Sequence, residues 1–119
     1  MRLSFIQLGT FVADWRSLRL DDDDLRALEM MLLDNPDRGQ VMSGTGGLRK
    51  LRFAPPSRHS GKSGGMRVGY IHLPGDGLIV FVLIFSKNEK ANLTSAERVQ
   101  TKTLMERLKR SLNARRNGP

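Results

Sequence analysis

The sequence predicts an α+β fold in a single domain over residues 1–119: a short N-terminal strand, two helices, a three-stranded antiparallel meander and a C-terminal helix. Three observations predict it. Apolar residues repeat at helical spacing near both ends of the chain, whereas residues 44–89 contain strand-like segments separated by Gly, Pro and Ser. A chain of 119 residues can bury one modest core, which favours one domain over two.

The first elements are a strand at residues 3–8 and a short helix ending near Leu18. Thr10 is the expected helix cap, because its hydroxyl can accept a hydrogen bond from a free backbone N–H. Phe11, Trp15 and Leu18 are spaced i, i+4 and i+7, so they share one face of this helix. That face is predicted to pack on the sheet.

A second helix is predicted to begin at residues 21–24, which are four consecutive aspartates. Carboxylates stabilise the positive end of a helix dipole, so their position ahead of an apolar helix indicates a helix start rather than a metal site. Asn35 and Pro36 end the helix and Gly39 completes the turn. The apolar stripe consists of Leu25, Leu28 and Leu32.

The meander follows a flexible glycine-rich lead-in at residues 44–47. Its three strands are predicted at residues 48–54, 66–73 and 78–86, joined by a basic loop at 55–65 and a tight turn at 74–77. The last strand is continuously apolar and β-branched, which is typical of a strand buried on both faces.

The C-terminal helix begins with a capping box formed by Thr94 and Glu97. Its apolar stripe consists of Leu104, Leu108 and Leu112, with Met105 beside it. Cations surround that stripe.

Charge is distributed unevenly along the chain. The formal charge of +8 divides into −4 for residues 1–37 and +12 for residues 38–119. Such a basic field attracts phosphates, so nucleic acid or an acidic protein is the expected partner. The chain has no cysteine, its N-terminus does not resemble a signal peptide, and its longest apolar run is too short to span a bilayer. These features predict a cytoplasmic protein without a membrane partner.

Strand alternation decides which cations can act together. Leu51 and Phe53 are expected to pack on the helices, which places Lys50 and Arg52 on the opposite, open face. These two cations therefore share one open surface.

The next two strands extend this surface. Val68 and Tyr70 are expected to pack inward, so Arg67 faces outward. The last strand is expected to place five alternate residues on one face: Ile79, Phe81, Leu83, Phe85 and Lys87. On this reading Lys87 joins the other cations, and Phe85 beside it is an exposed ring on which a base can stack.

Further cations flank these strands. Arg49, Arg58 and Lys62 are additional candidates for RNA contacts, together with Phe85. Residues 44–73 contain no carboxylate to neutralise this surface, and crowded cations would lower the pKa of at least one lysine. The alternative is that these residues simply form a solvated basic face.

No metal site or cofactor is predicted. Lys62 lies in a Gly-Lys-Ser triplet, but a phosphate-binding P-loop would need glycine where Pro56 stands. The two histidines, His59 and His72, lack the spacing of metal ligands.

The chain resembles the RelE/ParE superfamily of bacterial toxin–antitoxin toxins, most closely its HigB-like branch. The motifs that carry the resemblance are Gly44-Thr45-Gly46-Gly47-Leu48-Arg49-Lys50, Gly64-Gly65-x-Arg67, an aromatic followed by x-Lys87-Asn88-Glu89, and the Asn35-Pro36 turn. One departure is Phe85, which stands where relatives often have tyrosine; a phenyl ring can stack but cannot exchange a proton.

The resemblance implies a RelE-like fold and a toxin that cleaves messenger RNA in the ribosomal A site. It implies neutralisation by an antitoxin, usually one with a helix-turn-helix DNA-binding domain. By motif position, Lys50, Arg52 and Arg67 match the family's basic catalytic residues and Lys87 matches its basic C-terminal segment. The suggested chemistry is metal-independent transesterification by the ribose 2′-oxygen, with Lys50 as the hypothesised base.

Two other functions fit parts of the sequence. One is a ParE-like poison of DNA gyrase, although members of that branch generally lack the clustered lysines and arginines. The other is a nucleic-acid-binding protein without catalysis, which predicts salt-sensitive binding and no cleavage.

Overall fold

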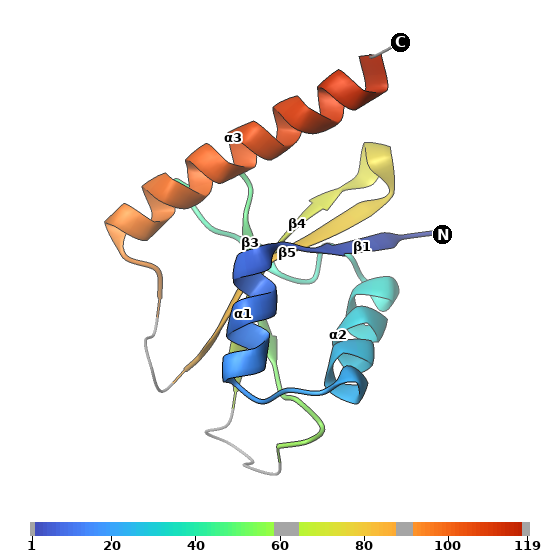
Figure 1. Ribbon diagram of the computed structural model, residues 1–119, viewed down its shortest axis with the longest axis vertical. Coiled ribbons are helices and arrows are strands. Elements are labelled where there is room, and N and C mark those ends of the chain that lie inside the picture. Colours follow the sequence, from blue (N-terminus) through green and yellow to red (C-terminus); the bar gives the residue numbers. More distant parts are fainter. Residues whose placement is uncertain (1, 59–64, 88–91, 118–119) are drawn as a thin grey trace.

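The computed structural model describes residues 2–58, 65–87 and 92–117, which form a five-stranded sheet and three α-helices (Figure 1). The strands are β1 (Ser4–Gln7), β2 (Gln40–Val41), β3 (Arg49–Phe53), β4 (Met66–Leu73) and β5 (Leu78–Ser86). The helices are α1 (Gly9–Ser17), α2 (Asp22–Asp34) and α3 (Ser95–Asn117). The sheet order is β1-β5-β4-β3-β2. The predicted α+β architecture is confirmed, with β2 as an additional strand.

The N-terminal segment adds an edge strand to the sheet. β1 pairs in parallel with β5, and α1 follows it directly. The prediction that Thr10 caps α1 is wrong: the N-cap is Leu8, and the Thr10 hydroxyl donates to the backbone carbonyl of Val82 at 2.8 Å. Thr10 therefore fastens α1 to β5. Phe11 and Trp15 are buried on one face of α1, as their spacing predicts.

The aspartate run begins α2 through a capping box. Asp21 accepts a hydrogen bond from the Asp24 backbone N–H, and the Asp24 carboxylate accepts one from the Asp21 N–H. Asp24 is also buried, and it accepts hydrogen bonds from the Ser57 N–H at 2.9 Å and the Ser57 hydroxyl at 2.6 Å. One carboxylate thus holds both the start of α2 and the segment that follows β3.

The first face of the sheet is covered by α1 and α2. Its core contains Leu51 and Phe53 from β3 and Val68 and Tyr70 from β4, packed with the buried residues of both helices. These four residues are the ones that alternation assigns to the inside. The β3–β4 register pairs Leu51 with Val68, so the apolar residues of both strands face the same way.

The second face is covered by α3 at one end only. Leu48, Ile71 and Val80 form a separate core there with Met105 of α3, and the predicted stripe of leucines packs around it. The capping box is confirmed, since Thr94 and Glu97 exchange hydrogen bonds of 2.8 and 3.1 Å. Figure 1 shows α3 crossing the sheet away from α1 and α2. Within the described residues, no helix combines the length and apolar character needed to cross a bilayer.

The glycine-rich lead-in is a fixed turn on which α3 docks. Gly44, Gly46 and Gly47 have positive φ angles, which glycine adopts without strain. Thr45 is buried between them, and its hydroxyl bonds the backbone at both Met42 and Leu48. A Cβ at Gly46 would lie 3.2 Å from Met105, so the absence of a side chain lets α3 approach. The predicted flexibility of this segment is wrong.

A β-bulge changes the alternation of β5. The register shifts between Gly69 and Tyr70 of β4, which pair with Leu83 and Phe81, so Val82 is the extra residue. Phe81 consequently belongs to the first core, whereas Phe85 belongs to the second. The prediction that alternate residues from Ile79 to Lys87 share one face is therefore wrong for those of them that precede the bulge, which face the first core.

Replacing Asp24 with alanine is expected to lower the free energy of unfolding by about 2–3 kcal/mol, because three donors in part-buried hydrogen bonds lose the buried carboxylate that accepts from them. Urea unfolding followed by Trp15 fluorescence measures the change. The exposed neighbour Asp22→Ala is the matched control and should cost much less. Equal losses in the two variants would contradict this role for Asp24.

The contribution of Asp24 should also depend on pH. Burial raises the pKa of Asp24, but hydrogen bonds from Ser57 and Asp21 outweigh burial and hold the pKa below its ordinary value of 3.8. A carboxyl group whose pKa is lower in the folded state than in the unfolded state stabilises the fold when the pH is above its unfolded-state pKa. That stabilisation is lost as the pH falls through the folded-state pKa. The stability gap between wild type and Asp24→Ala should therefore narrow on acidification below about pH 4. A gap that widens in acid would refute this.

Candidate nucleic-acid interface

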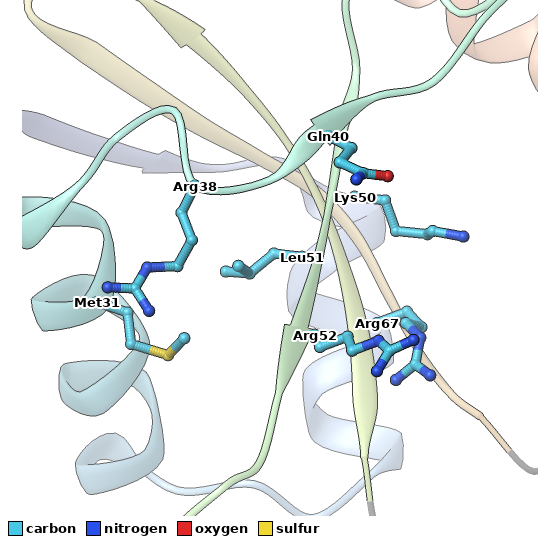
Figure 2. A pocket seen from close by; sticks show the side chains of 7 residues that line it. All are labelled: Met31, Arg38, Gln40, Lys50, Leu51, Arg52 and Arg67. Carbon is cyan, nitrogen blue, oxygen red and sulfur yellow. The ribbon is translucent and has the colours of Figure 1, made fainter.

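Arg52 and Arg67 are directly opposite each other on β3 and β4. Their neighbours Leu51 and Val68 occupy the first core, so alternation directs both guanidinium groups to the other face. Lys50 lies two residues earlier on β3, opposite Gly69, and shares that face. Figure 2 shows the side chains of Arg52 and Arg67 together, with Lys50 pointing to the same side of β3.

These cations line two adjoining hollows, which together we call the basic trough. The first hollow, of about 560 Å³, is lined by Lys50, Arg52 and Arg67 together with Met31, Arg38, Gln40 and Leu51. The second, of about 410 Å³, is lined by Arg52, Arg67 and Lys87 together with Met31, Phe53, Ala54 and Gly65. Because Met31, Arg52 and Arg67 belong to both, the trough is continuous. It brings together the four cations predicted as catalytic.

Lys87 reaches the trough from the end of β5. Its backbone N–H donates to the carbonyl of Gly65 at 3.2 Å, which prolongs the β4–β5 pairing by one residue. Phe85 pairs with Arg67, so Lys87 follows on the same side of the strand. The strand pairing, rather than any contact between the cations, fixes this position.

The trough carries uncompensated positive charge. Among the carboxylates of residues 2–58, 65–87 and 92–117, none makes an ion pair with Lys50, Arg52, Arg67 or Lys87. The nearest paired cation on its wall is Arg38, whose Nη2 lies 3.0 Å from Asp34 Oδ2. Four free cations in one open trough suit a phosphodiester.

The prediction that Phe85 is an exposed aromatic platform is wrong. Phe85 is only 6 % exposed and packs in the second core with Val82 and Leu93. The β5 bulge brings Phe85 to the side of the cations, but its ring is then covered by the core. Phe85 therefore does not present an exposed surface for a base.

Two of the predicted flanking RNA contacts lie away from the trough. Arg49 faces the opposite side of β3, where it donates to the backbone carbonyl of Gly39 at 2.7 Å and pairs with Asp37 at 3.4 Å. Arg58 donates to the carbonyl of Leu18, beside the α1–α2 connection. Neither lines the trough, so a contact between RNA and either residue stays a prediction. Lys62 lies outside the described residues.

The turn between α2 and β2 contributes residues that the sequence does not single out. Arg38 in this turn and Gln40 at the start of β2 both line the trough, and a hydrogen-bond network holds the turn. The Tyr70 hydroxyl donates to the Pro36 carbonyl at 2.7 Å and accepts from the Gly39 N–H at 2.9 Å. A Cβ at Gly39 would lie 2.9 Å from the Tyr70 ring, so glycine is required for this contact.

Charged groups complete the network. His72 Nδ1 lies 2.8 Å from Asp37 Oδ1, and this hydrogen bond is the main reason why the pKa of Asp37 is lowered. Burial raises the pKa of the Tyr70 phenol, so the hydroxyl stays protonated and keeps its donor. The run of cations in the sequence indicates the trough. The place of Arg38 on its wall depends instead on the hydrogen bonds between Tyr70 and the turn, which are distant from each other in the sequence.

Comparison with known proteins supports the fold. No protein-family model matches the chain. Among solved structures, it is similar to the free state of the E. coli toxin RelE in a double arginine-to-alanine mutant, with a TM-score of 0.53 and 15 % sequence identity. The match covers 84 % of this chain and 97 % of that one. Identity this low shows the fold alone, and the predicted RelE-like α+β fold is confirmed.

Replacing Tyr70 with phenylalanine should lower the free energy of unfolding by about 1–3 kcal/mol, because the Gly39 N–H and the Pro36 carbonyl lose a buried partner. Urea unfolding measures the loss, and amide hydrogen exchange should show reduced protection at Gly39. Unchanged stability with unchanged protection would show that the hydroxyl does not hold the turn.

Proposed function

We propose that this protein is an endoribonuclease toxin of a type II toxin–antitoxin pair, one that cleaves messenger RNA in the ribosomal A site. The observation that carries the proposal is the cross-strand pair of Arg52 and Arg67, flanked by Lys50 and Lys87 in one trough without a neutralising carboxylate among the described residues. Strand pairing holds these groups, so they meet a phosphate without first reorganising. The HigB-like branch remains a hypothesis that rests on the sequence motifs.

The reaction is transesterification within the RNA. The ribose 2′-oxygen attacks the adjacent phosphorus, the bond from phosphorus to the 5′-oxygen breaks, and the products are a 2′,3′-cyclic phosphate and a 5′-hydroxyl. Negative charge accumulates on the non-bridging oxygens as the phosphorane forms. Arg52 and Arg67 supply fork-shaped donors for these oxygens, and loss of one such donor costs on the order of 10²-fold in rate.

Proton transfers are assigned to the two lysines. Lys50 is the proposed base that takes the 2′-hydroxyl proton, and Lys87 is the proposed acid that protonates the departing 5′-oxygen. Phe85 has no exchangeable proton and is buried, so it serves neither role. The separation of Lys50 and Lys87, on either side of the arginine pair, suits attack from one side and departure on the other.

The proposal includes its partners. The substrate is messenger RNA on the ribosome, in the cytoplasm, and a cognate antitoxin with a helix-turn-helix DNA-binding domain neutralises the toxin. The motifs of the resemblance and the basic trough support this assignment. A ParE-like gyrase poison and a binder without catalysis are the alternative outcomes of the test below.

Lys50→Ala and Arg67→Ala should each reduce messenger RNA cleavage by purified protein on translating ribosomes by about 10²-fold or more, because each removes a group that acts in the transition state. Primer extension maps and quantifies the cuts. Arg107→Ala, which removes an exposed cation on α3, is the matched control and should cleave like wild type.

Several outcomes would refute the proposal. Cleavage that persists in both variants removes the site assignment. Wild-type protein that cuts no message but inhibits gyrase supports the ParE-like function, and salt-sensitive RNA binding without cutting supports a binder.

A further inference from the structure

The first hollow of the basic trough crosses the open edge of β3. β2 pairs with β3 only at Arg49 and Lys50, so from Leu51 onward no described strand covers the outer edge of β3. Figure 2 shows two different sides of this edge. Lys50, Arg52 and Arg67 lie on one side; Met31, Arg38 and Leu51 lie on the other.

The side away from the cations is apolar at its base. Met31 of α2 is half-buried and Leu51 is 5 % exposed, and both border the hollow. A thioether is polarisable and adapts to a flat ring, so the half-buried Met31 is the side chain here that can contact a base, whereas Leu51 is covered by the first core. Because Phe85 is covered by the core, this is where the described part of the trough offers an apolar surface to a base.

Arg38 forms the polar wall above that apolar base. Its guanidinium is held by Asp34 at 3.0 Å, and its backbone belongs to the turn that the Tyr70 hydroxyl closes. The side chain remains 40 % exposed, so donors are available to a ligand. A guanidinium group has donors only, arranged as a planar fork.

We propose that this side of the hollow binds the nucleobase next to the phosphodiester held by Arg52 and Arg67, and that it prefers guanine. Met31 contacts the ring, and Arg38 donates to its edge. Guanine is favoured because its O6 and N7 are adjacent acceptors that match the guanidinium fork, whereas adenine presents a donor beside N7. The inference rests on the proposed function in taking the bound polyanion to be RNA.

The test is a binding measurement that does not require cleavage. Fully 2′-O-methylated oligouridine hexamers carry guanine, adenine, cytosine, uracil or an abasic site at one central position, and fluorescence anisotropy measures their affinities at a fixed salt concentration. Wild type should bind the guanine probe about tenfold more tightly than the others. Arg38→Lys keeps the charge but removes the fork, so it should erase this preference and leave the remaining affinities nearly unchanged.

Two further variants make the result specific. Arg26→Lys alters an arginine of α2 that, like Arg38, is ion-paired to an aspartate but does not line the trough, so it should keep the guanine preference. Arg52→Ala should weaken the binding of all five probes in parallel, because it removes a phosphate contact.

The outcomes separate this inference from the function it rests on. Equal wild-type affinities for the five probes, a guanine preference that survives in Arg38→Lys, or no measurable binding of any probe would overturn the base site. Cleavage on ribosomes remains an independent readout, so a nuclease that passes that test but shows no base preference loses only the guanine site.

Discussion

The register of β3 against β4 is the constraint on which the rest of the structure depends. Leu51 is opposite Val68, and one residue later Arg52 is opposite Arg67. Burying the apolar pair under α1 and α2 forces the two arginines together on the other face, because a strand places successive side chains on opposite sides. Mutual repulsion of the cations disfavours this arrangement, and the hydrophobic core opposes that repulsion. A slip of one residue would bury the charge and expose the core.

The second face is divided between packing against α3 and an open trough. α3 covers the end near the glycine turn, where Gly46 allows close approach and Lys109 donates to the Gly46 carbonyl at 2.8 Å. The helix buries Leu48 and Ile71 and leaves the cations at the other end of the same strands uncovered. One face of the sheet therefore provides both a hydrophobic anchor for α3 and an open trough. The trough is held by strand pairing, which favours a preorganised site over one that forms on binding.

Much of this could be predicted from local pattern, and the exceptions have physical reasons. The bounds of β4 and β5, the start of α2, the capping box of α3 and the outward direction of Lys50, Arg52 and Arg67 follow from alternation, turn residues and helix-start signals. The bulge at Val82 does not, because it depends on how Gly69 meets Leu83 across the sheet: a Cβ there would lie 2.9 Å from the leucine. That bulge decides the environment of Phe85. Its exposure could not be predicted from alternation either, because the ring is covered by residues of the second core such as Leu93.

The candidate site shows the same limit. Cations on neighbouring strands can be recognised in the sequence, but Arg38 reaches the trough through a turn that is closed by Tyr70, 31 residues beyond Gly39. Arg49 illustrates the converse: it belongs to the same basic run as Lys50, yet it faces the other side and holds that turn. Charge along the sequence therefore identifies a region, and only the face of the strand on which each side chain lies separates cations of the trough from cations that hold the fold.

The most direct test of the account is an NMR titration that follows the arginine side-chain Nε–Hε signals while a 2′-O-methylated RNA dinucleotide is added. Signals of Arg52 and Arg67 should shift first and saturate together, because the account predicts that one phosphate bridges both guanidinium groups. Shifts confined to arginines of α3, such as Arg98, Arg107 and Arg110, would place the anion on the helix and contradict the trough as the RNA site.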